Sequence, residues 1–149
     1  MLKEFSIFTD TATLSIFDID AIKHRVADLC DWWSEEENEI LEVNKGNIAF
    51  LGLGVDGDYT IKVSETIEGE AGTLNLHFPS GNVFIGAGEF TSGGDLEPID
   101  LDVNDGEGET LNFAPGFYRM KFSRSENIIE LCFEPTTEKY NSIEESVRI

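Results

Sequence analysis

Carboxylates grouped in two stretches are the residues of this sequence with the clearest capacity for chemistry. One stretch spans residues 28–42 and the other spans residues 95–109, and neither contains a Lys or an Arg. Carboxylates without neighbouring bases are available to water, to a metal ion or to the basic groups of a partner. The residues that we predict to contact a partner are Asp31, Trp32, Glu35, Glu36, Glu37, Glu39, Asp100, Asp102, Asp105, Glu107 and Glu109.

Trp32 is the aromatic member of this predicted contact set. It is followed by Trp33, and adjacent helical residues point about 100° apart, so only one of the two rings can lie fully on a core stripe. Trp33 continues the apolar stripe of a predicted helix, which leaves Trp32 toward the acidic edge. An aromatic ring beside charged groups is typical of an interface hot spot. Partial burial under the Glu-rich loop is the alternative interpretation.

Residues 100–109 also present alternating oxygen donors, the ligands that calcium prefers. Their spacing departs from an EF-hand, because Gly106 falls one place late and Leu111 stands where a bidentate Glu is required. An edge strand followed by a Gly-rich acidic turn accounts for the same residues. A calcium-dependent or carbohydrate-binding module is therefore the alternative function, whereas the main interpretation requires no metal and no cofactor.

The sequence gives little support to catalysis. Its two histidines, His24 and His77, stand outside the spacings of metalloprotease and triad motifs, and we predict structural roles for both. Residues 52–57 match the pattern G-x-G-x-x-G, but a strand follows where a dinucleotide site needs a helix. Cys30 has no basic neighbour that would activate a thiolate. We predict that the chain is not an enzyme, and a carboxylate-based hydrolase is the least supported hypothesis.

The net charge restricts the classes of partner that the chain is expected to bind. The chain has 149 residues, and its 10 Lys and Arg against 30 Asp and Glu give a formal charge of −20. This charge repels phosphate and anionic lipid headgroups, so nucleic acid and membrane surfaces are disfavoured and a basic protein is favoured. Since 40% of the residues are hydrophobic and 11% are aromatic, the chain has enough apolar surface to fold as one domain over residues 1–149.

The predicted compartment is the cytoplasm. The first residues include no apolar stretch typical of a signal peptide, and no segment is long enough to span a membrane. Cys30 and Cys132 lie far apart in apolar surroundings, which favours two buried thiols over a secreted disulfide framework.

The elements that must position these residues are mostly strands. Period-2 alternation is clearest over residues 59–64, and similar apolar runs predict about eight to ten strands in an antiparallel β-sandwich. The other predicted strands contain residues 12–16, 48–53, 74–78, 83–87, 99–103, 118–122 and 129–133. Four turn sequences between them predict hairpins: Asp56-Gly57, Ser80-Gly81-Asn82, Pro115-Gly116 and Ser125-Glu126-Asn127.

One helix and one undecided segment complete the prediction. Apolar residues at helical spacing predict a short helix near residues 20–33, with Asp18 or Asp20 as its N-cap. Residues 136–149 are polar with isolated apolar side chains. A short helix, an edge strand and a mobile tail all remain open for them.

Several segments together resemble a family of small acidic bacterial proteins. The resemblance rests on residues 8–18 (FTDTATLSIFD), 31–34 (DWWS), 52–59 (GLGVDGDY) and 115–119 (PGFYR). Members of that family are regarded as cytoplasmic immunity proteins associated with secreted type VI or polymorphic toxins. The entry into the strand at residues 115–118 is also similar to that of the inhibitor of the bacterial competence nuclease. The resemblance implies a β-sandwich that binds and blocks one cognate toxin.

These lines converge on an immunity protein that inhibits a basic toxin, with a nuclease as the favoured class. A nuclease presents Lys and Arg to the phosphate backbone, and carboxylates at similar density can occupy the same groove and exclude the substrate. A rival mechanism blocks the toxin's active site by shape and uses the acidity for solubility alone. Binding that weakens steeply with salt would distinguish charge mimicry from this rival.

Overall fold

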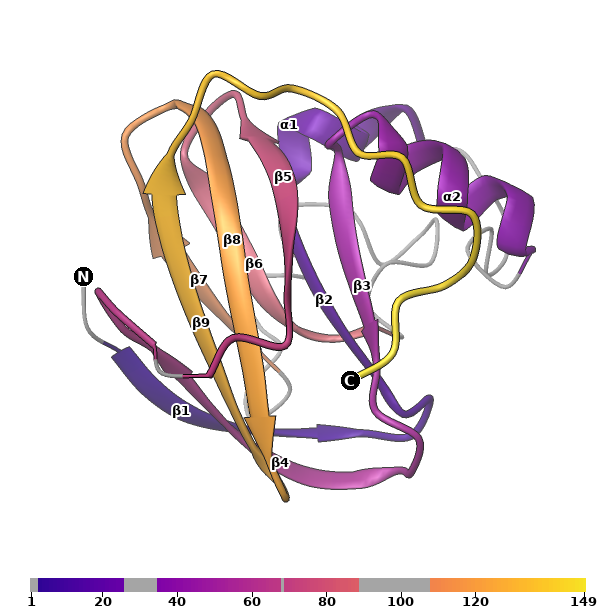
Figure 1. Ribbon diagram of the computed structural model, residues 1–149, viewed down its shortest axis with the longest axis vertical. Helices are drawn as coiled ribbons and strands as arrows, with labels where there is room; N and C mark the ends of the chain where they lie inside the picture. The colour runs from indigo at the N-terminus through magenta and orange to yellow at the C-terminus, as the bar shows by residue number, and fades with distance from the viewer. Residues whose placement is uncertain (1–2, 26–34, 68, 89–107) are drawn as a thin grey trace.

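The computed structural model describes residues 3–25, 35–67, 69–88 and 108–149, and these residues form a two-layer β structure (Figure 1). The five-stranded sheet has the order β1-β4-β9-β8-β5, and the four-stranded sheet has the order β3-β2-β6-β7. The strands of the first sheet are β1 (Lys3–Thr9), β4 (Gly57–Val63), β9 (Ile128–Pro135), β8 (Gly116–Ser125) and β5 (Gly72–Phe78). Those of the second are β3 (Ile48–Gly52), β2 (Thr13–Asp18), β6 (Asn82–Ala87) and β7 (Gly108–Asn112).

The mainly β sandwich fold predicted from the sequence is confirmed. Period-2 alternation appears in β4, where Tyr59, Ile61 and Val63 are buried and the intervening side chains are not. The continuous apolar runs predicted as strands covered on both faces are β3 and β6, whose residues are nearly all buried. β1 and β7 were not predicted, and the predicted strand at residues 99–103 lies outside the described residues.

The predicted pairing needs two corrections. β4 and β9 pair in parallel, although every other pairing among the described strands is antiparallel. Of the four predicted hairpin turns, only Ser125-Glu126-Asn127 joins neighbouring strands, β8 and β9. The other three connect β3 to β4, β5 to β6 and β7 to β8, and each of these connections crosses from one sheet to the other. Turn residues specify a reversal of the chain, but they do not specify which sheet the next strand joins.

The helical prediction is also only partly matched. Within the segment 20–33, the structure describes a short helix α1 (Ile19–Ile22) and a 3-10 turn η1 (Lys23–Arg25), and residues 26–34 lie outside the described residues. A second helix, α2 (Glu36–Asn44), occupies a stretch that the sequence analysis assigned to a Glu-rich loop.

Asp18 caps α1, which confirms one of the two predicted N-caps. Its carboxylate is fully buried and accepts a hydrogen bond from the backbone N–H of Asp20 at 2.9 Å. The same carboxylate accepts the backbone N–H groups of Ser80 and Gly81, each at 2.8 Å, and the Ser80 hydroxyl. Asp18 therefore ties the start of the helix to the β5–β6 connection, and its burial is compensated by these hydrogen bonds.

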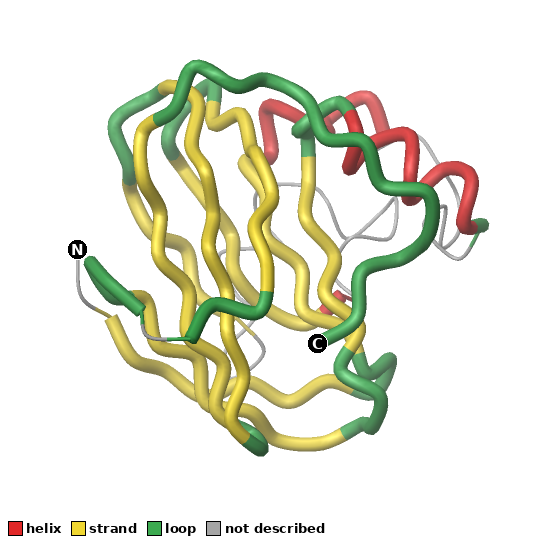
Figure 2. Tube along the Cα trace, in the orientation of Figure 1, coloured by secondary structure: helices red, strands yellow, loops and turns green. Residues whose placement is uncertain are grey.

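The last fourteen residues, 136–149, form neither a helix nor a sheet strand. They run as an extended segment that we call the strap, drawn in yellow in Figure 1 and as a loop in Figure 2. The strap passes over α2 and ends beside β3, where Arg148 forms an isolated parallel bridge with Gly52. β3 and β5 are edge strands of the two sheets, so α2 and the strap lie at the side of the sandwich where these edges meet.

No helix among the described residues is long and apolar enough to cross a membrane.

Candidate functional site

Helix α2 carries the largest described part of the predicted contact set. Its first turn contains Glu36, Glu37 and Glu39, where negative side chains interact favourably with the positive end of the helix dipole. The helix ends at Asn44, and Gly46, which follows the C-cap residue Lys45, has a φ of +75°. A Cβ at Gly46 would lie 2.7 Å from the carbonyl oxygen of Lys139, so the close passage of the strap also requires glycine there.

Three of the predicted contact residues, Glu35, Glu36 and Glu37, are exposed at the amino end of α2. The strap adds Glu144 and Glu145, which are also exposed. Within the described part of the chain, no Lys or Arg forms an ion pair with any of these five carboxylates. We call these five residues the acidic face.

A pocket of about 360 Å³ lies at this face, between the helix and the strap. Its lining residues are Glu36 from α2 and Glu145, Ser146 and Arg148 from the strap. The Ser146 hydroxyl lies 3.1 Å from a carboxylate oxygen of Glu36 and also hydrogen-bonds Glu39. The pocket is thus lined by two carboxylates, a hydroxyl and the guanidinium of Arg148, and its carboxylates can accept hydrogen bonds from the Lys or Arg side chain of a partner.

Glu39 is placed differently from the other acids of the first turn. It is only 9% exposed and its carboxylate is engaged by Ser146, so it lies under the strap and not on the acidic face. Burial raises the pKa of Glu39, the hydrogen bond from Ser146 opposes that rise, and the nearby charge of Glu36 adds to it. Its predicted contact with a partner stays a prediction, whereas its contact with the strap is a finding.

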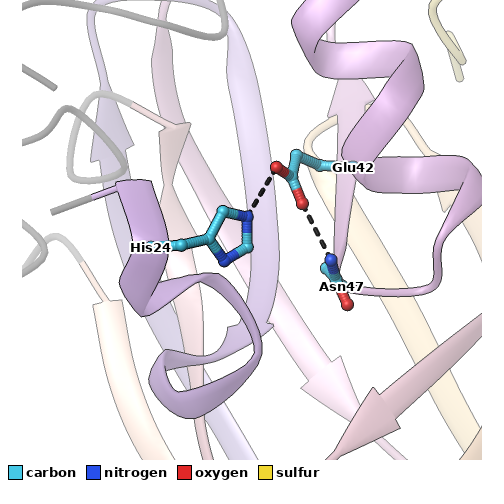
Figure 3. Close-up of polar contacts among 3 residues, drawn as sticks. All are labelled: His24, Glu42 and Asn47. Carbon is cyan, nitrogen blue, oxygen red and sulfur yellow. Dashed lines mark hydrogen bonds and ion pairs between the residues drawn. The ribbon is translucent and has the colours of Figure 1, made fainter.

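Glu42 forms the buried polar centre beneath α2 (Figure 3). Its side chain is 1% exposed, and one oxygen lies 2.7 Å from Nε2 of His24 while the other accepts from Nδ2 of Asn47 at 2.8 Å. These contacts join η1 to α2 and to the turn that precedes β3. The structural role predicted for His24 matches this arrangement, and the half-exposed imidazole is held by a carboxylate that the sequence analysis did not single out.

The described end of the second acidic stretch lies on a different element from the described part of the first. Of its predicted contact residues only Glu109 is described, while Asp100, Asp102, Asp105 and Glu107 lie outside the described residues, as do Asp31 and Trp32. Glu109 is in β7, at the opposite edge of the four-stranded sheet from β3, and its carboxylate lies 3.5 Å from Nζ of Lys3. The described members of the two stretches therefore form separate surfaces.

Two further sequence predictions concern metal and thiol chemistry. Among the described residues there is no group of three or more His, Cys, Asp or Glu side chains arranged to hold a metal ion. The proposed calcium stretch falls mostly outside those residues and stays a prediction. Cys132 is buried as predicted, and its thiol donates to the carbonyl oxygen of Glu65 at 3.1 Å. Cys30 is not described.

Comparison with known proteins identifies a family but no activity. The model of a family of unknown function, DUF6386, matches residues 1–149. The chain belongs to the DUF6386 family. No curated protein matches this DUF6386 chain. Its structure is similar to that of a protein described as crocagin biosynthetic gene J, with a TM-score of 0.53 and 11% sequence identity. The likeness covers 89% of this chain and 96% of the other, and at that identity it shows the fold alone.

Sequence reasoning missed the strap half of the site in this DUF6386 chain. Glu144, Glu145 and Ser146 were part of a segment whose structure was left open, and they come to the acidic face because the strap runs along α2. The two acidic residues, Glu144 and Glu145, can be identified in the sequence. Their proximity to the first acidic stretch could not be predicted, because helix α2 was not predicted.

Proposed function

We propose that this protein is an immunity protein, which binds a basic toxin in the cytoplasm and blocks its active site without performing chemistry. A nuclease is the favoured class of toxin. The observation that carries the proposal is the acidic face, Glu35, Glu36, Glu37, Glu144 and Glu145, which no described Lys or Arg neutralises.

Charge gives this surface both attraction and selectivity. A net charge of −20 produces a field that speeds encounter with a cationic partner, and association steered in this way reaches about 10⁸ M⁻¹s⁻¹ or above at low salt. The same field repels nucleic acid, so the inhibitor binds the toxin and does not itself bind a nucleic acid substrate. Fast association matters because an immunity protein must reach its toxin before the toxin reaches its target.

The geometry at the amino end of α2 suits a partner that inserts a Lys or Arg side chain. In the pocket, the carboxylates of Glu36 and Glu145 outnumber the one guanidinium, that of Arg148, and can bind the cation, and the exposed carboxylates around the pocket can bind further bases at the rim. The resemblance of the sequence to toxin-associated immunity proteins supports the same proposal. Asp31 and Trp32 precede α2 in the chain, and their predicted part in the contact is retained.

Co-purification at low salt tests the proposal. The tagged protein is expressed with the products of its neighbouring genes, and the proteins that elute with it are identified. We expect one basic protein at near one-to-one stoichiometry, whose toxicity is abolished when it is bound. Absence of such a partner, or a partner that stays toxic in the complex, would contradict the proposal.

Charge reversal locates the contact. We expect the double variant Glu36→Lys and Glu37→Lys to lose the partner, because it inverts the acidic face. The matched control, Asp56→Lys and Asp58→Lys, makes the same change in net charge on exposed residues at the other end of β3. Equal loss in both variants would show that the partner responds to overall charge and not to this face.

A further inference from the structure

The strap is held the way proteins hold an extended peptide ligand. We propose that the surface beneath it is a binding site for an extended peptide segment, and that the strap is the intramolecular occupant which a partner's segment can replace. We call this surface the strap site, and define it by Val43 and Asn44 on α2, Gly52 on β3 and Asn75 on β5. The strap site lies beneath the strap, whereas the acidic face includes Glu144 and Glu145 of the strap itself, and the inference does not depend on the toxin.

The strap site binds one amide side chain, that of Asn141, through three hydrogen bonds. Nδ2 of Asn141 donates to the carbonyl oxygens of Val43 at 2.7 Å and of Asn75 at 2.9 Å. Its Oδ1 accepts from the backbone N–H of Asn75 at 2.8 Å. All three partners are main-chain groups of the site, so the Asn141 amide satisfies the end of a helix and the edge of a sheet at once.

Further polar contacts of the strap site are made with the main chain of the occupant. The Asn44 side chain accepts from the N–H of Ile143 at 2.8 Å and donates to its carbonyl oxygen at 3.1 Å. Gly52 binds the main chain at the end of the strap in the same way. Its N–H donates to the carbonyl oxygen of Val147 at 2.9 Å, and its carbonyl oxygen accepts from the N–H of Ile149 at 3.0 Å. Recognition of this kind adds a strand to an exposed sheet edge and is open to any segment with suitable side chains.

Three aliphatic side chains give the occupant its apolar anchors. Ile143, Val147 and Ile149 are partly buried and pack against the hydrophobic core. With Asn141 they specify the pattern of a ligand, an amide followed by aliphatic residues two, six and eight positions later. The carboxylate of Glu36 on α2 stays beside this path when the strap is displaced, and it favours basic residues at the exposed positions of a competing segment.

The position of the strap makes it replaceable. It belongs to neither sheet, and the single bridge between Gly52 and Arg148 is its only ladder-type pairing among the described residues. Residues 137–140, in the first part of the strap, are exposed. A competing segment must overcome an effective concentration in the millimolar range, because the strap is tethered to its own site. Weakening the strap without altering the site should therefore reveal the site to a peptide added in trans.

The test uses the full chain carrying Asn141→Ala and a synthetic peptide of residues 137–149. The substitution removes the amide from the strap but leaves Val43, Asn44 and Asn75 unchanged, and the peptide supplies the missing amide. We expect the apparent Kd of the peptide for the variant to be at least about tenfold lower than for the unmodified chain, because the open state is more populated. A peptide with Asn141→Ala should lose most of that gain.

Two measurements make the outcome decisive. In NMR spectra of the isotope-labelled chain, unlabelled peptide should move the signals of the chain's own Val147 and Ile149 to positions typical of unstructured residues. The Ser146→Ala chain repeats the test with a weakening at another point of the strap, and thermal melts establish that each chain is folded. Equal affinity for both chains, equal affinity of both peptides, or binding without displacement of the strap would overturn the proposal.

Discussion

The carboxylate of Glu42, buried beneath α2, lies 2.7 Å from Nε2 of His24 and joins the 3-10 turn to the helix. The link is unusual in that the inward face of the helix carries acids, since Glu39, Glu42 and Val43 are its buried residues. Each buried carboxylate is compensated by hydrogen bonds, Glu39 with the strap and Glu42 with His24 and Asn47. The helix is therefore positioned largely by polar contacts.

A double-mutant cycle measures the His24–Glu42 link. We expect His24→Ala and Glu42→Ala each to destabilise the fold, and the pair to show a coupling free energy of about 1 kcal/mol, because the single changes remove the same hydrogen bond. Denaturant unfolding of the four proteins provides the measurement. Strict additivity would show that the two side chains lie together without stabilising each other.

Replacing Asp18 should be among the most damaging single changes. Asp18→Ala leaves the backbone N–H groups of Asp20, Ser80 and Gly81 without their acceptor in a buried setting, and we expect a loss of about 3 kcal/mol or more in the free energy of unfolding. Asp18→Asn, which keeps one carbonyl oxygen, should cost less. A variant Asp18→Ala with unchanged urea midpoint would refute the role assigned to this carboxylate.

Alanine substitutions at two glycines, Gly54 and Gly81, distinguish the cost of steric crowding from the cost of backbone strain. Gly81 and Gly54 have similar φ values of +84° and +86°, but a Cβ at Gly81 would lie 2.0 Å from the carbonyl oxygen of Phe113, whereas a Cβ at Gly54 would meet nothing within 4 Å. We expect Gly54→Ala to cost about 1 kcal/mol from strain alone and Gly81→Ala to cost several times as much. Similar thermal melts for the two variants would contradict the packing at the β5–β6 connection.

Protonation of Glu39 at acidic pH should stabilise the folded protein. Burial raises the pKa of Glu39, so the folded protein binds this proton more tightly than the unfolded chain. The corresponding stabilisation is fully present below the unfolded pKa and is lost as the pH rises through the folded pKa. Glu39→Gln should therefore gain stability relative to the unmodified protein between mildly acidic and neutral pH, as measured by thermal melts across that range. A difference in melting temperature between the two proteins that does not change with pH would contradict the raised pKa of Glu39.

Much of the fold could be predicted because the strands obey the alternation that a half-buried sheet requires. In β4 the buried Tyr59, Ile61 and Val63 alternate with polar residues, and the same pattern in β1 was readable at Phe5 and Ile7 but was not used. What the sequence did not predict is the path between the sheets. Connections such as Ser80-Gly81-Asn82 show the residues of a hairpin turn while joining strands of different layers.

The candidate site was only partly predictable for a physical reason. Helix α2 escaped detection because two of its three buried residues, Glu39 and Glu42, are acids, and a search for apolar periodicity cannot recognise such a face. The acids of its first turn were identified as contact residues from charge alone. Glu144 and Glu145 join them only through the course of the strap, which depends on long-range hydrogen bonds such as those of Asn141 and Asn44.

The rate of association with the captured partner tests the central claim most directly. It is measured by stopped-flow mixing from about 50 to 500 mM NaCl, a range over which the Debye length falls well below the size of the acidic face. We predict that the association rate constant falls steeply with salt, and that Glu36→Lys with Glu37→Lys slows association far more than Asp56→Lys with Asp58→Lys. An association rate that is insensitive to salt and equal in the two variants would contradict an inhibitor that works through its acidic face.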